Sequence, residues 1–262
     1  MIVLLIGMTL MVVPTPLTKA QGTSSQIAHS QISQSISNMP VSKAPEPSSF
    51  LLFGSGLFTM VLAFLRRAYN VTKRLMDIAI SSVALILLSP LCVLVAILIK
   101  LTSKGPVIYS QTRCGRDGED FEILKFRTMR TDAEKSTGPV WAKLKDNRIT
   151  PIGNILRKSR IDEIPQFINV LKGDMSVIGP RPERPVFVGK LEQQITDYRK
   201  RLAVKPGITG LAQVYHRYDE DLSDVRKKVK YDILYIKSMC FLTDMRIILS
   251  TFRVIVTGFG AR

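Results

Sequence analysis

Three long apolar runs lie within the first 100 residues of the chain. The first, residues 1–13, has the length of a secretory signal peptide but lacks the basic residues with which such peptides start. Residues 21–49 contain nine serines and few large apolar side chains, so this stretch is too polar to bury a core. We therefore predict a signal-like segment and a disordered linker over residues 1–49.

The second apolar run covers residues 50–65 and is followed by Arg66 and Arg67. It is slightly shorter than the roughly 20 residues that a helix needs to span a bilayer, and a basic pair of this kind marks a cytoplasmic flank. A Pro-Glu-Pro step precedes the run, and the whole arrangement resembles the PEP-CTERM sorting tail that normally ends a secreted bacterial protein. We interpret residues 50–69 as a hydrophobic anchor rather than as a processing site.

The third apolar run, residues 75–99, is long enough to span a membrane, and Asp77 is its only charged residue. Ser89 and Pro90 interrupt it, and a proline inside a helix removes a hydrogen bond and kinks the path. Basic residues flank the run on both sides: Lys73, Arg74, Lys100 and Lys104. Because basic flanks favour the cytoplasmic side, we predict over residues 70–104 a re-entrant membrane helix that breaks at Ser89-Pro90 and returns through the same leaflet. A kinked spanning helix is the alternative.

Beyond Gly105 the pattern becomes that of a soluble α/β domain, mainly helical with a short β-hairpin. A short stretch that reads as a strand, a turn with two glycines and a second stretch that alternates apolar and polar residues are together typical of a hairpin. Helical spacing of apolar residues follows, and one helix is expected to end at Gly173. The expected strands cover residues 106–111 and 121–129, and the expected helices cover residues 152–158 and 163–171.

The C-terminal stretch, residues 225–257, carries apolar residues at helical spacing among many lysines. Such an amphipathic helix lies along a membrane surface or packs on the body of the domain, and the sequence favours neither. Together with the re-entrant helix, this pattern predicts a monotopic membrane protein with amphipathic interfacial helices.

Composition narrows the chemistry. The formal net charge is +16, most of it beyond residue 69, which suits a polyanionic partner such as nucleic acid, an anionic leaflet or a phosphate-rich substrate. Three cysteines lie far apart without paired spacing, so neither a disulfide framework nor a zinc site is supported. His29 and His216 are the only histidines, which disfavours His-based metal or triad chemistry. Carboxylates are the better catalytic candidates.

The densest group of interpretable residues surrounds the consecutive acids Asp162 and Glu163. Adjacent side chains point in different directions, so the two carboxylates suit two separate roles. An aspartate attacks phosphorus to form a covalent intermediate, and a neighbouring acid holds Mg²⁺. Nearby Arg157, Lys158 and Arg160 favour the ionised acids. The alternative is an acidic pair that only stabilises the dipole of the following helix.

Two basic segments are candidates for binding phosphate. Prolines on both sides of Arg181 restrict the backbone, so its guanidinium is presented with little loss of entropy. Lys125 and Arg127 lie at the end of the second expected strand. A stiff surface turn and a solvated charged face are the alternatives. A glycine-rich segment over residues 205–214 lacks the Walker and Rossmann spacings, and we interpret it as a turn.

These motifs, in this order, resemble the monotopic phosphoglycosyl transferase family, the bacterial sugar transferases that start exopolysaccharide assembly. The resemblance covers about three quarters of the chain, from about residue 70 to the C-terminus, judged by the order of its motifs. It rests on the basic residues with Asp77, the Ser89-Pro90 step, and the sequences Lys-Phe-Arg-Thr-Met at 125–129, Asp-Glu-Ile-Pro-Gln at 162–166, Gly-Pro-Arg-Pro at 179–182 and Lys-Pro-Gly-Ile-Thr-Gly at 205–210. The first 69 residues are an addition that the minimal family lacks.

The resemblance implies a cytoplasmic catalytic domain over residues 105–262 at the bacterial inner membrane. Asp162 is then the nucleophile that displaces UMP from a UDP-sugar, Glu163 helps bind Mg²⁺, and undecaprenyl phosphate accepts the sugar-1-phosphate. Arg157 and Arg181 fall at positions that bind phosphate in the family, with Lys125 and Arg127 as further candidates. Membrane lipids are implied as partners and nucleic acid is not, and a homodimer is left open.

A second function class has to be weighed against this enzyme. A basic, membrane-tethered module that binds anionic lipid or nucleic acid without catalysis explains the charge and the helices. It gives no reason for the acid pair among arginines, so we favour the transferase.

Overall fold

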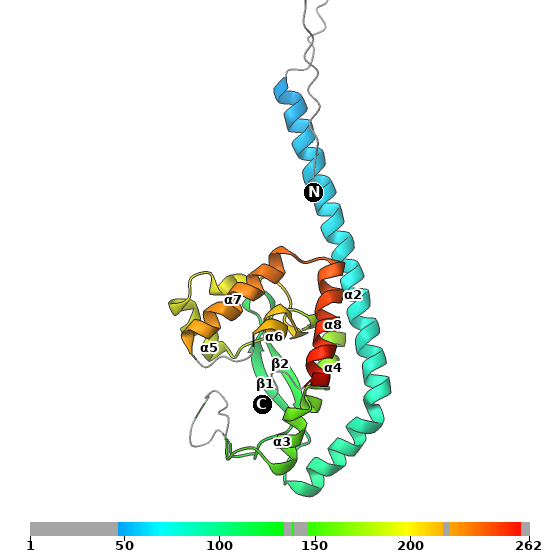
Figure 1. Ribbon diagram of the computed structural model, residues 1–262, viewed down its shortest axis with the longest axis vertical. Coiled ribbons are helices and arrows are strands. Elements are labelled where there is room, and N and C mark those ends of the chain that lie inside the picture. The colour runs from blue at the N-terminus through cyan, green and yellow to red at the C-terminus, as the bar shows by residue number, and fades with distance from the viewer. Residues whose placement is uncertain (1–46, 134–137, 139–145, 217–220, 258–262) are drawn as a thin grey trace, which may run out of the picture. The chain divides into compact units, whose positions relative to one another are not determined.

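The computed structural model describes residues 47–133, 138, 146–216 and 221–257, so the predictions for residues 1–46 lie outside the described part. Two compact units divide the chain, Met1–Phe58 and Thr59–Arg262. The described part of the first unit consists of the initial turns of helix α2. The second unit holds the remainder of α2 and all other elements (Figure 1).

Helix α2 (Pro47–Thr102) is one continuous helix of 56 residues. The stretch around Arg66 and Arg67 contains no proline or glycine and is rich in good helix formers, so the two apolar runs are joined without a loop. Within the described residues, α2 is the one helix long and apolar enough to cross a membrane, over Ser55–Thr102. Most large apolar side chains of this stretch are exposed, which is compatible with a membrane-associated protein.

At the predicted break, Ser89-Pro90, the helix continues on both sides, and α2 curves toward its C-terminal end (Figure 1). Pro90 has no N–H to donate to the carbonyl oxygen of Ile86, four residues earlier. The Ser89 hydroxyl donates to that same oxygen at 2.8 Å. Because serine satisfies the acceptor that proline leaves open, the helix continues through this position.

The predicted hairpin is confirmed with shifted ends. Strand β1 (Ile108–Cys114) pairs antiparallel with strand β2 (Asp120–Phe126), and the register places Tyr109 opposite Lys125. The turn is a short 3-10 helix, η1 (Arg116–Gly118), in which the Asp117 backbone adopts a left-handed conformation. Strand β2 ends three residues earlier than predicted, so Arg127 lies outside the pairing.

Helix α3 (Pro151–Lys158) is confirmed, and its start follows from a cap. The Thr150 hydroxyl accepts a hydrogen bond from the Gly153 N–H, and a proline occupies the first helical position. Helix α4 (Gln166–Lys172) is shorter than predicted at its start and ends at Gly173, which has φ 98°. Asp162 and Glu163 belong instead to a separate 3-10 turn, η2 (Ile161–Glu163).

The glycine-rich segment has a packing role beyond the turn expected for it. Strand β3 (Ser176–Ile178) pairs in parallel with strand β4 (Gly207–Thr209), which lies within that segment. A Cβ atom on Gly207 would lie 2.0 Å from the backbone nitrogen of Gly179, and one on Gly210 would lie 2.2 Å from the Gly179 carbonyl oxygen. Two backbone segments therefore meet where only glycine fits.

The remaining described elements complete the body. They are α5 (Pro185–Gln194), the 3-10 helix η3 (Tyr198–Ala203), α6 (Leu211–Tyr215), α7 (Leu222–Lys237) and α8 (Phe241–Thr257). Tyr235 of α7 and Ile247 of α8 are buried in one core cluster with Ile178 of β3. Both C-terminal helices thus pack on the body.

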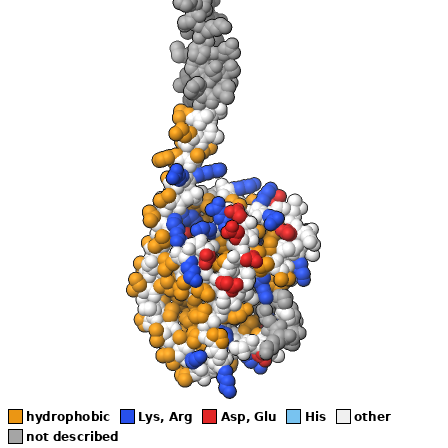
Figure 2. Space-filling view, turned by 180° about the vertical axis from the view of Figure 1, so that it is seen from behind, with side chains coloured by type: hydrophobic (Ala, Val, Ile, Leu, Met, Phe, Trp, Pro, Cys, Tyr) orange, Lys and Arg blue, Asp and Glu red, His pale blue; other side chains and the backbone are white. Residues whose placement is uncertain are grey.

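Packing on the body does not use the whole surface of α8. Its exposed apolar side chains include Phe241, Leu242, Leu249 and Phe252. Figure 2 shows hydrophobic side chains over much of the face on the α2 side, with charged side chains concentrated in its upper part. The amphipathic character predicted for the C-terminal stretch is therefore present together with a core contact.

Candidate active site

The acid pair lies in a tight reversal of the chain between α3 and α4. Arg160 has φ 57° and ψ 16°, a left-handed conformation that turns the chain out of α3 and into η2. Asp162, only 8% exposed, is buried, and the next residue, Glu163, is half-buried. A non-glycine residue in this conformation is uncommon and is typical of sites where position matters more than local strain.

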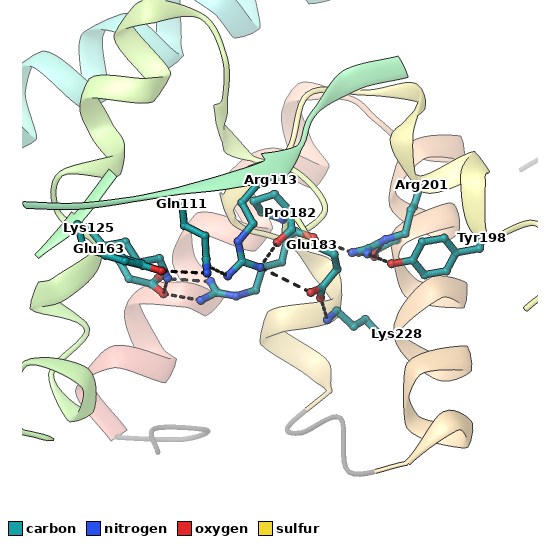
Figure 3. A network of polar contacts seen from close by, with 12 residues as sticks. Gln111, Arg113, Lys125, Glu163, Pro182, Glu183, Tyr198, Arg201 and Lys228 are labelled. Carbon is teal, nitrogen blue, oxygen red and sulfur yellow. Dashed lines mark hydrogen bonds and ion pairs between the residues drawn. The ribbon is translucent and has the colours of Figure 1, made fainter. Parts of the chain in front are cut away.

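Glu163 is held by two basic side chains from different parts of the fold (Figure 3). Arg181 Nη2 donates to Glu163 Oε1 at 2.5 Å, and Lys125 Nζ donates to the same oxygen at 3.2 Å. Arg181 Nη1 also lies 3.4 Å from Glu163 Oε2. Burial alone would raise the pKa of Glu163, but the Arg181 and Lys125 charges outweigh it and hold that pKa below its usual range. Glu163 is therefore ionised at neutral pH.

Asp162 has a different environment. Burial and the neighbouring Glu163 charge raise its pKa to about 6, against the opposing effects of Lys125, Arg157 and Arg181. In the described part of the chain, no group donates a hydrogen bond to its carboxylate. A buried carboxylate that keeps its lone pairs uncommitted beside fixed cations is suited to attack an electrophile.

Arg157 and Lys125 also bring their charges near Asp162. Arg157 Nε donates to the Thr128 hydroxyl at 2.9 Å, which fixes the guanidinium just beyond strand β2. Its charge and that of Asp162 act on each other. Burial lowers the pKa of Lys125, and the nearby Glu163 charge opposes that effect. The structure thus places four predicted residues, Lys125, Arg157, Glu163 and Arg181, around Asp162.

Arg127 is placed elsewhere. Its Nη2 donates to the Ser103 carbonyl oxygen at 2.9 Å and to the Ser103 hydroxyl at 2.7 Å, so the buried guanidinium ties the end of β2 to the end of α2. Lys125 and Arg127 are two positions apart and would share a face of a continuous strand, but β2 ends at Phe126, so Arg127 does not follow the strand pattern. The contacts of Arg127 are therefore structural. The two residues predicted to interrupt the membrane helix, Ser89 and Pro90, lie within α2, in another part of the chain.

The residues present fit a Mg²⁺ ion that takes most of its ligands from phosphate and water. Among the described residues, no group of three or more His, Cys, Asp or Glu side chains forms a ready metal cluster. Asp162 has a carboxylate without hydrogen-bond donors, and Glu163 lies next to it. Mg²⁺ commonly binds through one or two carboxylates together with substrate phosphates, which this acid pair provides for.

A second polar network, which the sequence analysis missed, adjoins the acid pair (Figure 3). Lys228 Nζ donates to Glu183 Oε1 at 2.8 Å, and Arg201 pairs with Asp232 at 2.8 Å. A signal was available, because Lys228 and Asp232 occur at core positions of the amphipathic pattern that also buries Val225 and Val229. A charged residue on the apolar face of a helix indicates a buried partner.

Comparison with known proteins gives two family matches on this chain. Residues 68–258 match the model for bacterial sugar transferases, and residues 43–67 match the PEP-CTERM protein-sorting motif. The two matches meet at residues 67 and 68, within helix α2. Both resemblances stated from the sequence are thereby confirmed.

Curated relatives share the same region. The UDP-N-acetylgalactosamine-undecaprenyl-phosphate N-acetylgalactosaminephosphotransferase of Aeromonas hydrophila is 48% identical over 74% of this chain and 46% of its own length. The UDP-glucose:undecaprenyl-phosphate glucose-1-phosphate transferase of Klebsiella pneumoniae is 44% identical over 69% of this chain and 39% of its own length.

A Caulobacter vibrioides protein of the same name as the Klebsiella enzyme is 39% identical over 73% of this chain and 72% of its own length. The first two relatives are matched over less than half their length, whereas this one is matched over most of it. The family model for bacterial sugar transferases covers residues 68–258, which is most of the chain. The chain belongs to the bacterial sugar transferase family.

Proposed function

We propose that this chain transfers a sugar-1-phosphate from a UDP-sugar to undecaprenyl phosphate through a covalent aspartyl-phosphosugar intermediate. The observation that carries the proposal is the buried Asp162 carboxylate, free of hydrogen-bond donors among the described residues, beside a Glu163 neutralised by Arg181 and Lys125. The names of the relatives support the donor and acceptor classes. The reaction is the first membrane step of exopolysaccharide synthesis.

The proposed reaction has two balanced steps. An oxygen of ionised Asp162 attacks the phosphorus that carries the sugar, and the bond from that phosphorus to the bridging oxygen breaks, so UMP leaves with the bond's electron pair. An oxygen of undecaprenyl phosphate then attacks the same phosphorus, and the Asp162 carboxylate leaves. Each step exchanges one P–O bond for another, and neither needs a general acid. Polyprenyl-diphosphate-sugar is the product.

The basic residues have the task that phosphoryl transfer mainly requires, which is alignment and neutralisation of oxygen charge. Arg181, whose guanidinium contacts Glu163, brings positive charge beside the acid pair, and Arg157 and Lys125 add further charge near Asp162. Arg127 is left out of this set because its guanidinium is engaged with Ser103. Mg²⁺, held by Glu163 and phosphate oxygens, would add positive charge at the diphosphate.

For location, we propose the bacterial inner membrane, with the catalytic domain facing the cytoplasm. The exposed apolar surface of α2, the proline inside the helix at position 90 and the basic flanks of residues 75–99 support a helix that enters and leaves one leaflet. Cysteines introduced as Thr72→Cys and Lys104→Cys, in a protein with Cys92 and Cys240 changed to serine, test this path. We expect an impermeant reagent to label both from the cytoplasmic side. Labelling from opposite sides would mean that the helix spans the bilayer.

The function is tested directly with the full chain in membranes. We expect radiolabelled UDP-sugar and undecaprenyl phosphate together to give a labelled lipid product and UMP. Donor alone should leave a labelled protein that the acceptor then discharges, as a two-step mechanism requires. Lipid binding without UMP formation across a panel of UDP-sugars would instead indicate a membrane-tethered binding module.

A further inference from the structure

The backbone that presents Arg181 to the acid pair is fixed by side chains from distant elements (Figure 3). Arg201 Nη2, from η3, donates to the carbonyl oxygen of Arg181 at 2.8 Å. Arg113 Nη1, from β1, donates to the carbonyl oxygen of Pro182 at 3.2 Å. Two successive peptide units next to the active site are therefore each held by a guanidinium that makes no contact with Asp162.

The next residue, Glu183, extends this arrangement. Its carbonyl oxygen accepts a hydrogen bond from the Cys114 N–H at 2.9 Å. Its carboxylate pairs with Lys228 at 2.8 Å and with Arg113 at 3.7 Å, and these cations, with Arg201, hold its pKa low at about 2 despite burial. Three consecutive carbonyl oxygens, those of residues 181 to 183, thus each accept a hydrogen bond from another element.

Each nitrogen of the Arg201 guanidinium donates a hydrogen bond. Its side chain is 2% exposed, its Nε donates to Asp232 Oδ2 at 2.9 Å, and its Nη1 donates to the Tyr198 hydroxyl at 3.0 Å. Burying such a pair is expensive, and well-packed apolar residues are often as stable in its place. Apolar residues could not replace the rigid guanidinium fork of Arg201, which binds both Asp232 and the carbonyl oxygen of Arg181.

We propose that Arg201, held by Asp232, is a positioning residue that sets the place of the Arg181 guanidinium over the acid pair. The inference rests on the proposed function for the role of Arg181 in catalysis, while the structural effect is independent of it. Lys228 supports the same segment through Glu183. A small displacement of a phosphate-binding group is enough for a large loss of rate, because transition-state contacts depend on alignment.

The test compares Arg201→Lys with Arg199→Lys in the full-length protein. Lysine at position 201 keeps the charge beside Asp232 but lacks the fork that also reaches the Arg181 carbonyl oxygen. Arg199 is in the same 3-10 helix, is 74% exposed and pairs with Glu192 at the surface, so it is the matched control. We expect Arg201→Lys to lower kcat by roughly 10- to 100-fold with little change in KM for the UDP-sugar, and Arg199→Lys to leave both unchanged.

A double-mutant cycle distinguishes positioning from general structural support. If Arg201 acts through Arg181, then adding Arg201→Lys to Arg181→Ala should change kcat by less than about twofold. Hydrogen exchange gives a readout without activity: the backbone amides of Gly179, Arg181, Glu183 and Arg184, the residues of this segment that carry an N–H, should exchange faster in Arg201→Lys, with the rest of the protein unchanged. Additive losses in the cycle, or faster exchange throughout the protein, would overturn the proposal. A wild-type protein that transfers no sugar would refute the proposed function, and the exchange measurement would still decide the role of Arg201.

Discussion

Two aspartates, Asp162 and Asp244, are both buried beside basic residues, yet their surroundings differ. Asp244 of α8 is completely buried, and both of its oxygens are bonded: Oδ1 accepts from the Tyr235 hydroxyl at 2.9 Å, and Oδ2 accepts from the Tyr69 hydroxyl at 2.8 Å and from Lys73 at 2.9 Å. Asp162 accepts no hydrogen bond from any described residue. One carboxylate is fully satisfied and the other is not.

The difference separates structural support from reactivity. Asp244 joins α2 to α7 and α8, and each bond it accepts offsets the cost of burying its charge. Asp162 lies near cations that keep it anionic at neutral pH but occupy none of its lone pairs. Burial alone therefore does not distinguish the two aspartates, and the absence of donors is what makes Asp162 the candidate for the proposed nucleophile.

The most severe test of the comparison is Asp162→Asn, which keeps the shape of the side chain and removes the carboxylate proposed as the nucleophile. We expect transfer to fall by at least about 10⁴-fold, because no other described carboxylate is placed to attack the same phosphorus. Initial rates with saturating UDP-sugar and acceptor measure the loss. Glu192→Gln, which alters a surface carboxylate paired with Arg199, is the control and should retain full activity. Residual turnover near the wild-type rate would exclude the covalent mechanism.

Asp244→Ala should affect stability instead. Removing one partner of a buried pair leaves Lys73 without its counter-charge, and we expect a loss of about 3–5 kcal/mol in the free energy of unfolding. Denaturant unfolding in detergent measures it. Glu192→Ala, at an exposed ion pair, should lose no more than about 1 kcal/mol. Normal stability combined with lost catalysis in Asp244→Ala would contradict the structural role of this aspartate.

Glu163→Gln tests an intermediate case: this carboxylate accepts hydrogen bonds, as Asp244 does, but it lies next to Asp162. We expect transfer to fall by about 100-fold, since Arg181 and Lys125 lose the charge that holds them in place, and the Mg²⁺ concentration for half-maximal rate to rise. A magnesium titration of the initial rate measures both effects. Glu122→Gln is the matched control, because the Glu122 carboxylate accepts hydrogen bonds from the Ser110 and Thr112 hydroxyl groups at the exposed surface of the hairpin. An unchanged magnesium dependence would exclude metal binding by Glu163.

The smallest expected effect is on pH dependence. Because the pKa of Asp162 is raised to about 6, transfer should fall about tenfold for each pH unit below that value. A raised carboxyl pKa means that the folded state binds a proton more readily than the unfolded state, so the contribution of Asp162 to stability increases as the pH falls from about 7 to about 5. Activity and thermal stability of the wild type should therefore change in opposite directions relative to Asp162→Asn. If activity and thermal stability both fell as the pH was lowered, the loss of activity in acid would be due to unfolding.

Much of the acid site was predictable because its residues belong to short, ordered motifs. Asp162 and Glu163 were found from adjacency, and Arg181 from the prolines around it. The hairpin followed from alternation of apolar and polar residues. These signals are local, so sequence alone carries them.

The rest depends on long-range placement. Lys73 and Asp244 are separated by 171 positions, and no local pattern connects them. Lys125 and Arg127 looked equivalent, yet the end of β2 between them sends one side chain to Glu163 and the other to Ser103. Only the folded chain decides such cases.

The glycines that let β3 and β4 meet have a practical consequence for engineering donor choice. A methyl group on Gly207 or Gly210 would overlap the backbone of Gly179, two residues before Arg181. Random libraries that include these three positions will consist largely of misfolded members, whatever the sugar under selection. Exposed residues of the hairpin are better positions to vary. Tyr109 is one of them: the register places it opposite Lys125, and a different side chain there leaves the packing of the scaffold intact.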